Sequence, residues 1–437
     1  MGGDMQILWQ VLRFAIVKFK PGSVVIVSIL LAQLWITSAT SASRNYEYIN
    51  GLWFDGQTFV GKRFYSVNGV LTSRKPGQVD SVIDLNGKFV IPPFAEAHNH
   101  NVESSRIDRV IKMYLEAGIF YVKNPNSLPR FTAPLRGKIN ISTSIDVIFA
   151  NGGLTGIGGH PVELVQRNIN RKIWTEADGE GSFYFTIDNQ ADLVSKWPAI
   201  EAGKPDFIKT YLLYSEEYDK RKDDPQTFGW RGLNPTLLPE IVKRARLAGL
   251  RVSTHVESAA DFHNAVMAGV DEINHMPGFR GSPKLSIPDP KVYEIAETDA
   301  RLAGRKGIVV VTTLSGIRSI QGTLREQADQ LHRRNLNTLK KHHVRVAVGS
   351  DEYGSTSATE AMYLSGLKVF SNLELLKMWC EATAETIFPK RKIGHLKDGY
   401  EASFLVLSAD PITDFANTQK VEIRVKQGEI LSLSTPQ

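Results

Sequence analysis

Apolar and polar residues alternate along both ends of the chain. Residues 46–73, YEYINGLWFDGQTFVGKRFYSVNGVLTS, alternate around glycine-containing turns, and ASFLVLSADP (402–411) and VEIRVKQGEILSL (421–433) show the same pattern. A period of two residues interrupted by turn residues is typical of short, half-buried β-strands. We therefore expect β-hairpins at both ends of the chain.

Between these ends, apolar segments alternate with helical patterns such as residues 234–249 and 259–269. Eight strand–helix units over about 300 residues predict an α/β fold, a parallel (β/α)₈ barrel. Residues 151–204 exceed a simple crossover and contain the strand-like SFYFTI, which indicates an insertion. The expected strands are Phe89–Ala97, Gly118–Lys123, Ile145–Ala150, Asp206–Tyr211, Arg251–His255, Glu272–His275, Gly307–Thr312 and Arg345–Gly349.

Six residues with metal-binding side chains fall at one end of this predicted barrel. In FAEAHNHN (94–101), two histidines one residue apart close the first strand, so both imidazoles face the same side. The others stand in strand four or close strands five, six and eight. Catalytic groups of such barrels come from the carboxyl ends of the strands. The six residues are His98, His100, Lys209, His255, His275 and Asp351.

Two further residues are candidates for binding a substrate. His160 follows the third strand in NGGLTGIGGHP, on the same face of the barrel; the glycines there lack the spacing of a phosphate-binding P-loop. Tyr211 stands two residues after Lys209 and should face the same cavity. Its hydroxyl would bind an oxyanion or a substrate carboxylate; the alternative is a tyrosine of the core. The remaining histidines fall on predicted helices or at the opposite end.

These residue types favour divalent cations. Two histidines with Asp351 make one site rich in nitrogen and oxygen, and His255 with His275 makes a second. Such ligands suit Zn²⁺, with Mn²⁺, Fe²⁺ and Co²⁺ as alternatives. Two adjacent cations need a bridging anion, and a neutral Lys209 would supply one by adding CO₂ to form a carbamate. The alternative is that Lys209 pairs with a substrate carboxylate or with Asp351.

Composition excludes several classes of protein. With 42% hydrophobic and 22% charged residues, the 437-residue chain can bury a sizeable core. A formal charge of +6 without a basic stripe between aromatic residues argues against nucleic acid as a partner. The single cysteine, Cys380, excludes an intrachain disulfide and a four-cysteine zinc site. The oligomeric state is left open, a homo-oligomer included.

The amino terminus predicts export. Basic residues, the last of them Lys20, precede the apolar run Val24–Ile36, and the small residues TSATSAS follow it. This order is that of a secretory signal peptide, here residues 1–42 with cleavage after Ala42. We expect an exported chain, periplasmic or secreted. The alternative is an uncleaved anchor, which would then be the contact with the membrane.

Five separated segments, taken in order, resemble the amidohydrolase superfamily, and the resemblance extends from about Gly51 to Gly428. It implies a metal-dependent hydrolase barrel over residues 93–393 and a small composite β-sandwich from residues 43–92 and 394–437. The lysine on strand four is similar to that of the binuclear imidazolonepropionase-like and prolidase-like members. The segments are VIPPFAEAHNHN (90–101), DFIKTYLL (206–213), RVSTHVES (251–258), DEINHM (271–276) and VAVGSDE (346–352).

The resemblance also implies roles for the six residues. His98 and His100 would hold one metal ion with Asp351, His255 and His275 would hold the second, and carboxylated Lys209 would bridge the two. Zinc is the expected metal. Two positions depart from the family pattern: Glu96 and Ser403 stand where aspartate is usual. Neither is a ligand position, and the first would alter the surroundings of the ligands.

The activity that this resemblance implies is hydrolysis of a C–N bond in a small amide, cyclic amide or dipeptide-like substrate. A hydroxide shared by the two metals would attack the carbonyl, and Asp351 would carry the proton to the leaving nitrogen. One alternative is a mononuclear deaminase, which usually has glutamate three residues after the strand-five histidine; here Glu257 comes two after it. The other is a metal-free binding or scaffold protein on the same fold.

Overall fold

The computed structural model describes residues 44–278 and 290–433. The predicted signal peptide, residues 1–42, lies outside the described residues. Within the described ranges, no helix combines the length and the apolar content needed to cross a membrane.

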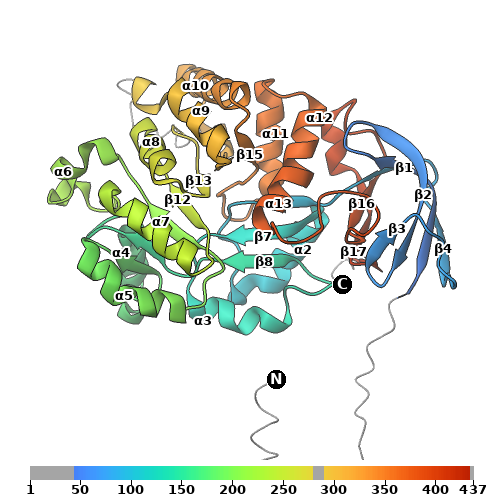
Figure 1. Cartoon of the computed structure of the whole chain (residues 1–437), viewed down its shortest axis with the longest axis horizontal. Coiled ribbons are helices and arrows are strands. Elements are labelled where there is room, and N and C mark those ends of the chain that lie inside the picture. Colours follow the sequence, from blue (N-terminus) through green and yellow to red (C-terminus); the bar gives the residue numbers. More distant parts are fainter. Residues whose placement is uncertain (1–43, 279–289, 434–437) are drawn as a thin grey trace, which may run out of the picture. The chain divides into compact units, whose positions relative to one another are not determined.

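Strands from both ends of the chain form one eight-stranded sheet (Figure 1). The two ends meet where β5 pairs antiparallel with β16, with Val90 opposite Val406. On its buried side, the rings of Tyr48 and Phe404 pack edge to face, 4.9 Å apart. The hairpin prediction is thereby confirmed, and the two ends build a single unit. The strands are β1 (Tyr46–Phe54), β2 (Phe59–Val67), β3 (Val70–Thr72), β4 (Ser81–Asp84), β5 (Phe89–Ile91), β16 (Phe404–Leu407), β17 (Val421–Lys426) and β18 (Glu429–Ile430).

The prediction of one strand over Phe89–Ala97 is wrong. The segment divides at Pro92 and Pro93 into β5, which belongs to the sheet of the chain ends, and β6 (Phe94–Glu96). Proline has no N–H to donate to a strand ladder and restricts the residue before it. The two prolines therefore end one strand and let the chain cross to another sheet.

The remaining strands are paired in parallel and form two sheets. One has the order β6-β7-β8, and the other has the order β10-β9-β11-β12-β13-β14-β15. The other seven predicted strands all have a counterpart among them, and SFYFTI contains β10 of the predicted insertion. The new strands are β7 (Ile119–Asn124), β8 (Asp146–Phe149), β9 (Gly153–Thr155), β10 (Tyr184–Thr186), β11 (Ile208–Tyr211), β12 (Val252–His255), β13 (Glu272–Asn274), β14 (Val309–Val311) and β15 (Arg345–Ala347).

Backbone hydrogen bonds connect the two parallel sheets at both junctions. Just beyond β15 and β6, Ala97 N donates to Val348 O at 2.9 Å and Asp351 N donates to His98 O at 2.8 Å. At the other junction, Asp206 N donates to Phe149 O at 2.8 Å. The ladders of paired strands do not continue from one parallel sheet into the other. The α/β parallel architecture is thus observed, and closure into a single eight-stranded barrel stays a prediction.

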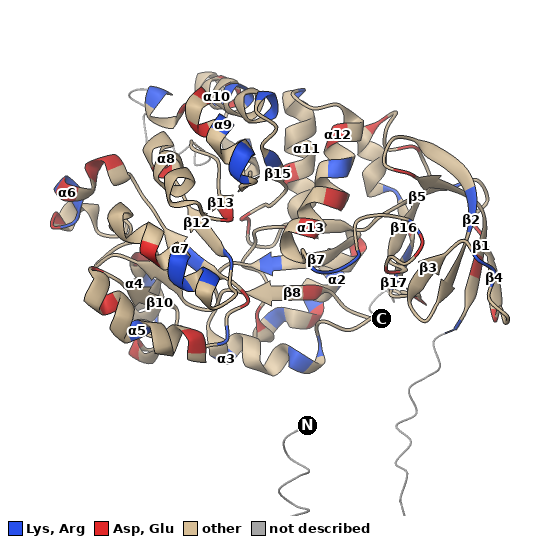
Figure 2. Ribbon diagram, viewed as in Figure 1, with Lys and Arg blue, Asp and Glu red and all other residues tan. Residues whose placement is uncertain are grey.

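Helices follow most of these strands and carry interspersed acidic and basic residues (Figure 2). The predicted helices at 234–249 and 259–269 are confirmed as α7 and α8. The α-helices are α2 (Ile107–Glu116), α3 (Pro129–Thr132), α4 (Val162–Asn170), α5 (Gln190–Ala202), α6 (Tyr218–Arg221), α7 (Leu238–Leu247), α8 (Ala259–Ala268), α9 (Glu297–Lys306), α10 (Thr323–Lys341), α11 (Ser357–Leu367), α12 (Asn372–Lys377) and α13 (Thr383–Ile387).

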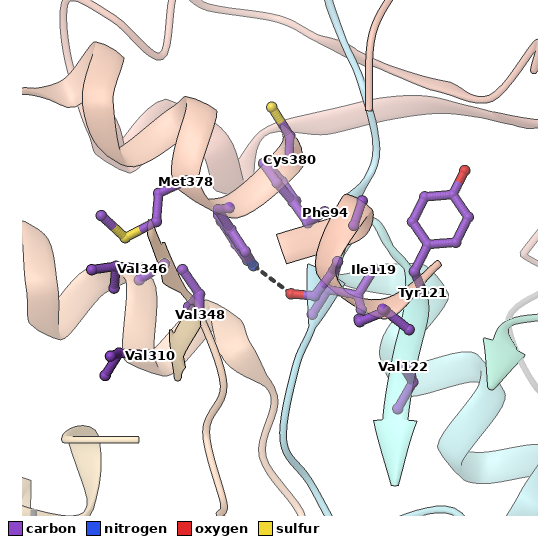
Figure 3. Close-up of a cluster of buried hydrophobic side chains, with 14 of the residues drawn as sticks. Phe94, Ile119, Tyr121, Val122, Val310, Val346, Val348, Met378 and Cys380 are labelled. Atoms are coloured by element: carbon purple, nitrogen blue, oxygen red, sulfur yellow. Dashed lines mark hydrogen bonds between the residues drawn. The ribbon is translucent and has the colours of Figure 1, made fainter. Parts of the chain in front are cut away.

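A stacked aromatic pair fixes β6 in the core. Phe94 and Trp379 lie with ring centroids 3.7 Å apart, and the Trp379 indole donates to the carbonyl of Ala95 at 3.1 Å. Because β6 leads directly into His98, this packing also positions the first pair of histidines. Figure 3 shows the surrounding cluster, which includes Phe94, Ile119, Val122, Val310, Val346, Met378 and Cys380.

Candidate active site

A cavity of about 710 Å³ opens beyond the carboxyl ends of the parallel strands. Its walls include all eight residues that the sequence proposed as metal ligands or substrate-binding groups. The structure therefore brings together side chains that are up to 253 positions apart in the chain, as for His98 and Asp351. The eight residues are His98, His100, His160, Lys209, Tyr211, His255, His275 and Asp351.

Asp351 lies at the centre of a group of three histidines. Its Oδ1 is 3.6 Å from Nε2 of His98 and 3.4 Å from Nε2 of His100, and its Oδ2 is 3.9 Å from Nδ1 of His275. Ligand atoms of His98, His275 and Asp351 all lie within 4.8 Å of one another. His275 also lies beside His255, with ring centroids 4.4 Å apart. It thus adjoins both of the predicted metal sites.

The chemistry of these donors fits divalent cations. Burial lowers the pKa of His98 well below its usual value, with the nearby Lys209 as a second cause. Burial also lowers the pKa of His100. Both imidazoles are therefore neutral at physiological pH, which is the form that binds a metal. A partly exposed carboxylate beside neutral histidines is a donor set of the kind that binds zinc or a related cation.

Asn274 orients the first of these histidines. Its side-chain oxygen accepts hydrogen bonds from Nδ1 of His98 and, at 3.3 Å, from Nζ of Lys209. Its amide nitrogen donates to Oε1 of Glu272 at 2.7 Å and to Oγ of Ser253 at 2.5 Å. A carboxylate only accepts hydrogen bonds, so the amide has a single satisfactory orientation. The proton of His98 is thereby placed on Nδ1, and Nε2 faces Asp351.

A buried ion pair lies behind Asn274. Nζ of Lys123 on β7 donates to Oε1 of Glu272 on β13, and both side chains are 2% exposed. The same ammonium group is 4.1 Å from the ring centroid of Phe207. Burial lowers the pKa of Lys123 to about 8. The pair neutralises the carboxylate that holds the Asn274 amide.

Glu96, which stands where the family usually has aspartate, contacts the segment that carries Asp351. Its carboxylate accepts hydrogen bonds from the backbone N–H and the hydroxyl of Ser350, each at 2.8 Å. These bonds connect the end of β6 to the residue that precedes Asp351. At Gly349, an added Cβ would lie 2.8 Å from the backbone nitrogen of His98. Glycine at this position therefore permits the close approach of the two segments that carry ligands.

Three residues around the cavity have left-handed backbone conformations. The φ angles are 74° at His275, 55° at Thr313 and 49° at Asp351. This region is uncommon for residues other than glycine, and it is an outlier for a β-branched threonine. Oγ1 of Thr313 lies 2.7 Å from Nδ1 of His275. Part of the backbone strain of the described chain thus lies where the candidate ligands are held, as is common at functional sites.

The second histidine pair has its own acidic neighbour. Nε2 of His255 is 3.1 Å from Oε1 of Glu257, and both side chains are buried. Because a carboxylate accepts, Nε2 of His255 is the donor of this contact. Sequence reasoning considered Glu257 only for its spacing and did not predict this contact.

Tyr211 and His160 face one another at the edge of the ligand group, with ring centroids 5.2 Å apart. The side-chain amide of Asn126 donates to the Tyr211 oxygen at 2.9 Å, so the phenolic proton is available for a second partner. Burial raises the pKa of Tyr211. The phenol thus remains a hydrogen-bond donor at the pH of any ordinary environment. Nδ1 of His160 lies 2.6 Å from Oε1 of Glu163.

Other histidines serve packing or surface contacts, as expected. His332 on α10 is buried between the Tyr363 hydroxyl, at 2.8 Å, and the Gly278 carbonyl, at 3.2 Å. His263 contacts Asp299 at 2.9 Å. Neither lines the cavity.

Comparison with known proteins agrees with this geometry. A model of the amidohydrolase family matches residues 228–431, the segment that contains His255, His275 and Asp351. Solved amidohydrolase structures superpose on 89% of the chain. The chain belongs to the amidohydrolase superfamily.

Three similar proteins illustrate the membership. Ochratoxinase of Aspergillus niger is 26% identical over 206 residues, which are 44% of this chain and 39% of that protein. This chain thus matches well under two thirds of its curated relative. The crystal structure of A. niger ochratoxinase has a TM-score of 0.69 at 17% identity, covering 89% of this chain and 95% of the other.

The match with two other solved structures covers almost the whole length of those proteins. An amidohydrolase has a TM-score of 0.67 at 18% identity, covering 89% of this chain and 98% of that one. A prolidase complexed with N-methylphosphonate-L-proline has the same score and identity, covering 89% and 99%. At these identities the likeness shows the fold, which supports a barrel with an additional β domain.

Proposed function

We propose that this amidohydrolase-superfamily protein is an exported, metal-dependent hydrolase of a C–N bond in a small amide. The observation that carries the proposal is the convergence of four histidines, Lys209 and Asp351 on one cavity at the carboxyl ends of the strands. The ligand atoms of His98, His275 and Asp351 already lie within 4.8 Å of one another. Membership of the superfamily supports the same reaction type.

The residues present divide into two groups of metal ligands. His98, His100 and Asp351 would hold one cation, and His255 with His275 would hold the other. Zinc is the metal that this donor set favours. When bound, divalent cations of this kind polarise a carbonyl and lower the pKa of water.

Lys209 would supply the bridging anion. Its side chain is 1% exposed, and its Nζ lies 3.3 Å from the Asn274 oxygen. A neutral amine adds CO₂ to form a carbamate and releases one proton, and the carbamate nitrogen keeps one hydrogen. That hydrogen would still donate to Asn274. The contact seen here therefore suits both the free lysine and the carbamate.

Asp351 would act as the acid–base group. Its carboxylate is partly exposed to the cavity and lies between the two predicted ligand groups. It would accept the proton of the attacking water and deliver it to the leaving nitrogen. Tyr211 would donate its phenolic hydrogen to the carbonyl oxygen as negative charge develops there. His160, beside Tyr211, would contact the substrate.

Substitutions at Lys209 test the proposal directly. Lys209→Ala should lose metal and activity together, because two cations would face each other without an anion between them. High acetate or propionate with added metal should restore part of both. Lys209→Glu should keep more metal than Lys209→Ala, and Lys209→Arg should be inactive, since guanidinium cannot take up CO₂.

Metal stoichiometry measured on these three variants distinguishes the two possible roles of Lys209, a carbamate bridge or a cation for the substrate. If Lys209 instead acted as a cation for the substrate, arginine would be the mildest change and metal content would stay constant. A mild Lys209→Arg phenotype would therefore exclude the carbamate. Wild-type protein purified without chelator with well under one metal per chain would favour a metal-free binding protein over the hydrolase.

Asp351→Asn tests the acid–base role. The amide can still coordinate through oxygen, so the variant should keep its fold and much of its metal. It cannot carry a proton, so kcat should fall by several orders of magnitude. Steady-state kinetics beside metal analysis would check this, and near-normal turnover would remove Asp351 from proton transfer.

A further inference from the structure

The cavity has two chemically different parts. The candidate ligands occupy one part, around Asp351. The other is an apolar wall formed by Pro161 and Leu164 at the start of α4, Phe183, and Ile320 with Leu324 at the start of α10. The exposed fraction of Leu324 is 45%, although it lines a cavity rather than a convex surface. An apolar surface of this kind beside a polar end is typical of a site for a small, mostly apolar ligand.

Positive charge in the lining is confined to the candidate metal site. Among the described residues that line the cavity there is no arginine, and Lys209 is the one lysine. Under the proposed function, Lys209, as a carbamate, and four histidines would be ligands of the metal ions. His160 remains, and the carboxylate of Glu163 lies 2.6 Å from its Nδ1.

Two arginines near the mouth have acidic partners. Arg318 donates to both oxygens of Glu352 at 2.8 Å, and Arg106 lies 2.6 Å from Glu103. Arg167 on α4 is exposed and lies outside the lining, although its charge acts on Tyr353, which lines the cavity. The polar lining that remains is neutral and consists of Asn126, Tyr211, Ser319, Gln321 and Tyr353, with Thr313 and Ser350 close to the ligands.

We propose that the substrate of this site is an uncharged amide with a bulky apolar group, which lies against Leu164, Phe183 and Ile320. The inference rests on the proposed function and names its substrate class. A substrate with a carboxylate next to the scissile nitrogen would have to leave water for a lining whose described residues include no arginine, and no lysine outside the candidate metal site, close to Asp351 and Glu163. Burying a charge in this way is costly. An aryl or aralkyl group would instead gain from burial.

A matched pair of substrates tests this class. N-Benzoylphenethylamine and N-benzoylphenylalanine share the scissile amide and both rings, and differ in one carboxylate. In metal-loaded wild-type protein, kcat/KM should be about a hundredfold higher for the uncharged amide. A ratio near one, or a preference for the carboxylate, overturns the inference while the hydrolase proposal stands.

Two variants on α4 provide the control. Leu164→Arg places a guanidinium within the lining and should lower the preference for the uncharged amide about tenfold or more. Arg171→Leu, at the C-cap of the same helix, removes an exposed cation outside the lining and should leave the ratio unchanged. A ratio that follows Arg171 rather than Leu164 contradicts the assignment.

Binding measurements separate failure of the inference from failure of the proposed function. If neither compound is hydrolysed, calorimetric titration of metal-loaded protein with each still gives their relative affinities. Tighter binding of the uncharged amide supports the substrate class even as the lack of turnover contradicts the hydrolase. Equal or weaker binding of the uncharged amide overturns the inference.

Discussion

Asn274 carries no charge and is not an expected metal ligand, yet its side chain makes four hydrogen bonds inside the protein. Two donors, on His98 and Lys209, point at its oxygen, and two acceptors, on Glu272 and Ser253, face its nitrogen. A leucine of similar size would leave Glu272 and both donors with fewer partners in a buried environment. At this scale, the orientation of the expected ligands depends on neutral neighbours.

Asn274→Leu should therefore weaken metal binding. Loss of a partner that orients a metal-binding histidine typically costs 10- to 100-fold in affinity, and we expect a decrease of about that size. Competition with a chelator of known affinity would measure it. Ser253→Ala is the matched control, because it removes a partner of the amide nitrogen and leaves the oxygen in place; its affinity should stay within about twofold. Wild-type affinity in Asn274→Leu would refute this role.

Some of the residues of the site could be predicted from the sequence and others could not. His98, His255, His275 and Asp351 could be placed because each stands at the end of a predicted strand, and strand ends gather at one edge of a parallel sheet. Glu272 and Asn274 resemble ordinary polar residues of a short strand. The contact of Glu272 with Lys123 is made across the interior, between β13 and β7. Sequence spacing contains no information about such a contact.

At the level of elements, the site depends on how closely β6 and β15 approach one another. An added Cβ at Gly349 would meet Val311 Cγ1 at 2.7 Å and two atoms of His98 at 2.8 and 2.9 Å. The strand prediction located both elements correctly at their carboxyl ends. It failed at the amino-terminal end of β6, where the effect of Pro92 and Pro93 outweighed a continuous apolar pattern.

Gly349→Ala should consequently displace the His98 segment. We expect a loss of about 1–3 kcal/mol in the free energy of unfolding, as for other cases of overpacking, together with reduced metal content. Gly366→Ala on α11 is the control, since an added Cβ there meets nothing within 4 Å. That change should be neutral or stabilising, because alanine favours helix. Urea unfolding of both variants checks the prediction, which fails if they behave alike.

At the level of the whole molecule, we expect the amino-terminal segment to be removed during export. Cleavage after Ala42 would take away Asp4, Arg13, Lys18 and Lys20, which lowers the formal charge from +6 to +4. Mass spectrometry of the exported protein should give a first residue near Ser43. An intact amino terminus in the membrane fraction would instead establish the uncleaved anchor.

The pairing of β5 with β16 has a consequence for synthesis of the chain. Ile91 emerges from the ribosome long before Leu405, its partner in the finished sheet. During translation, the β5 edge is therefore open, and it stays open until the last strands are made. An open strand edge can pair with other chains, so nascent protein would need protection by chaperones over most of its synthesis. Ribosome stalling before residue 404 would release a polypeptide that cannot complete this sheet, and such fragments would be ready targets for proteases.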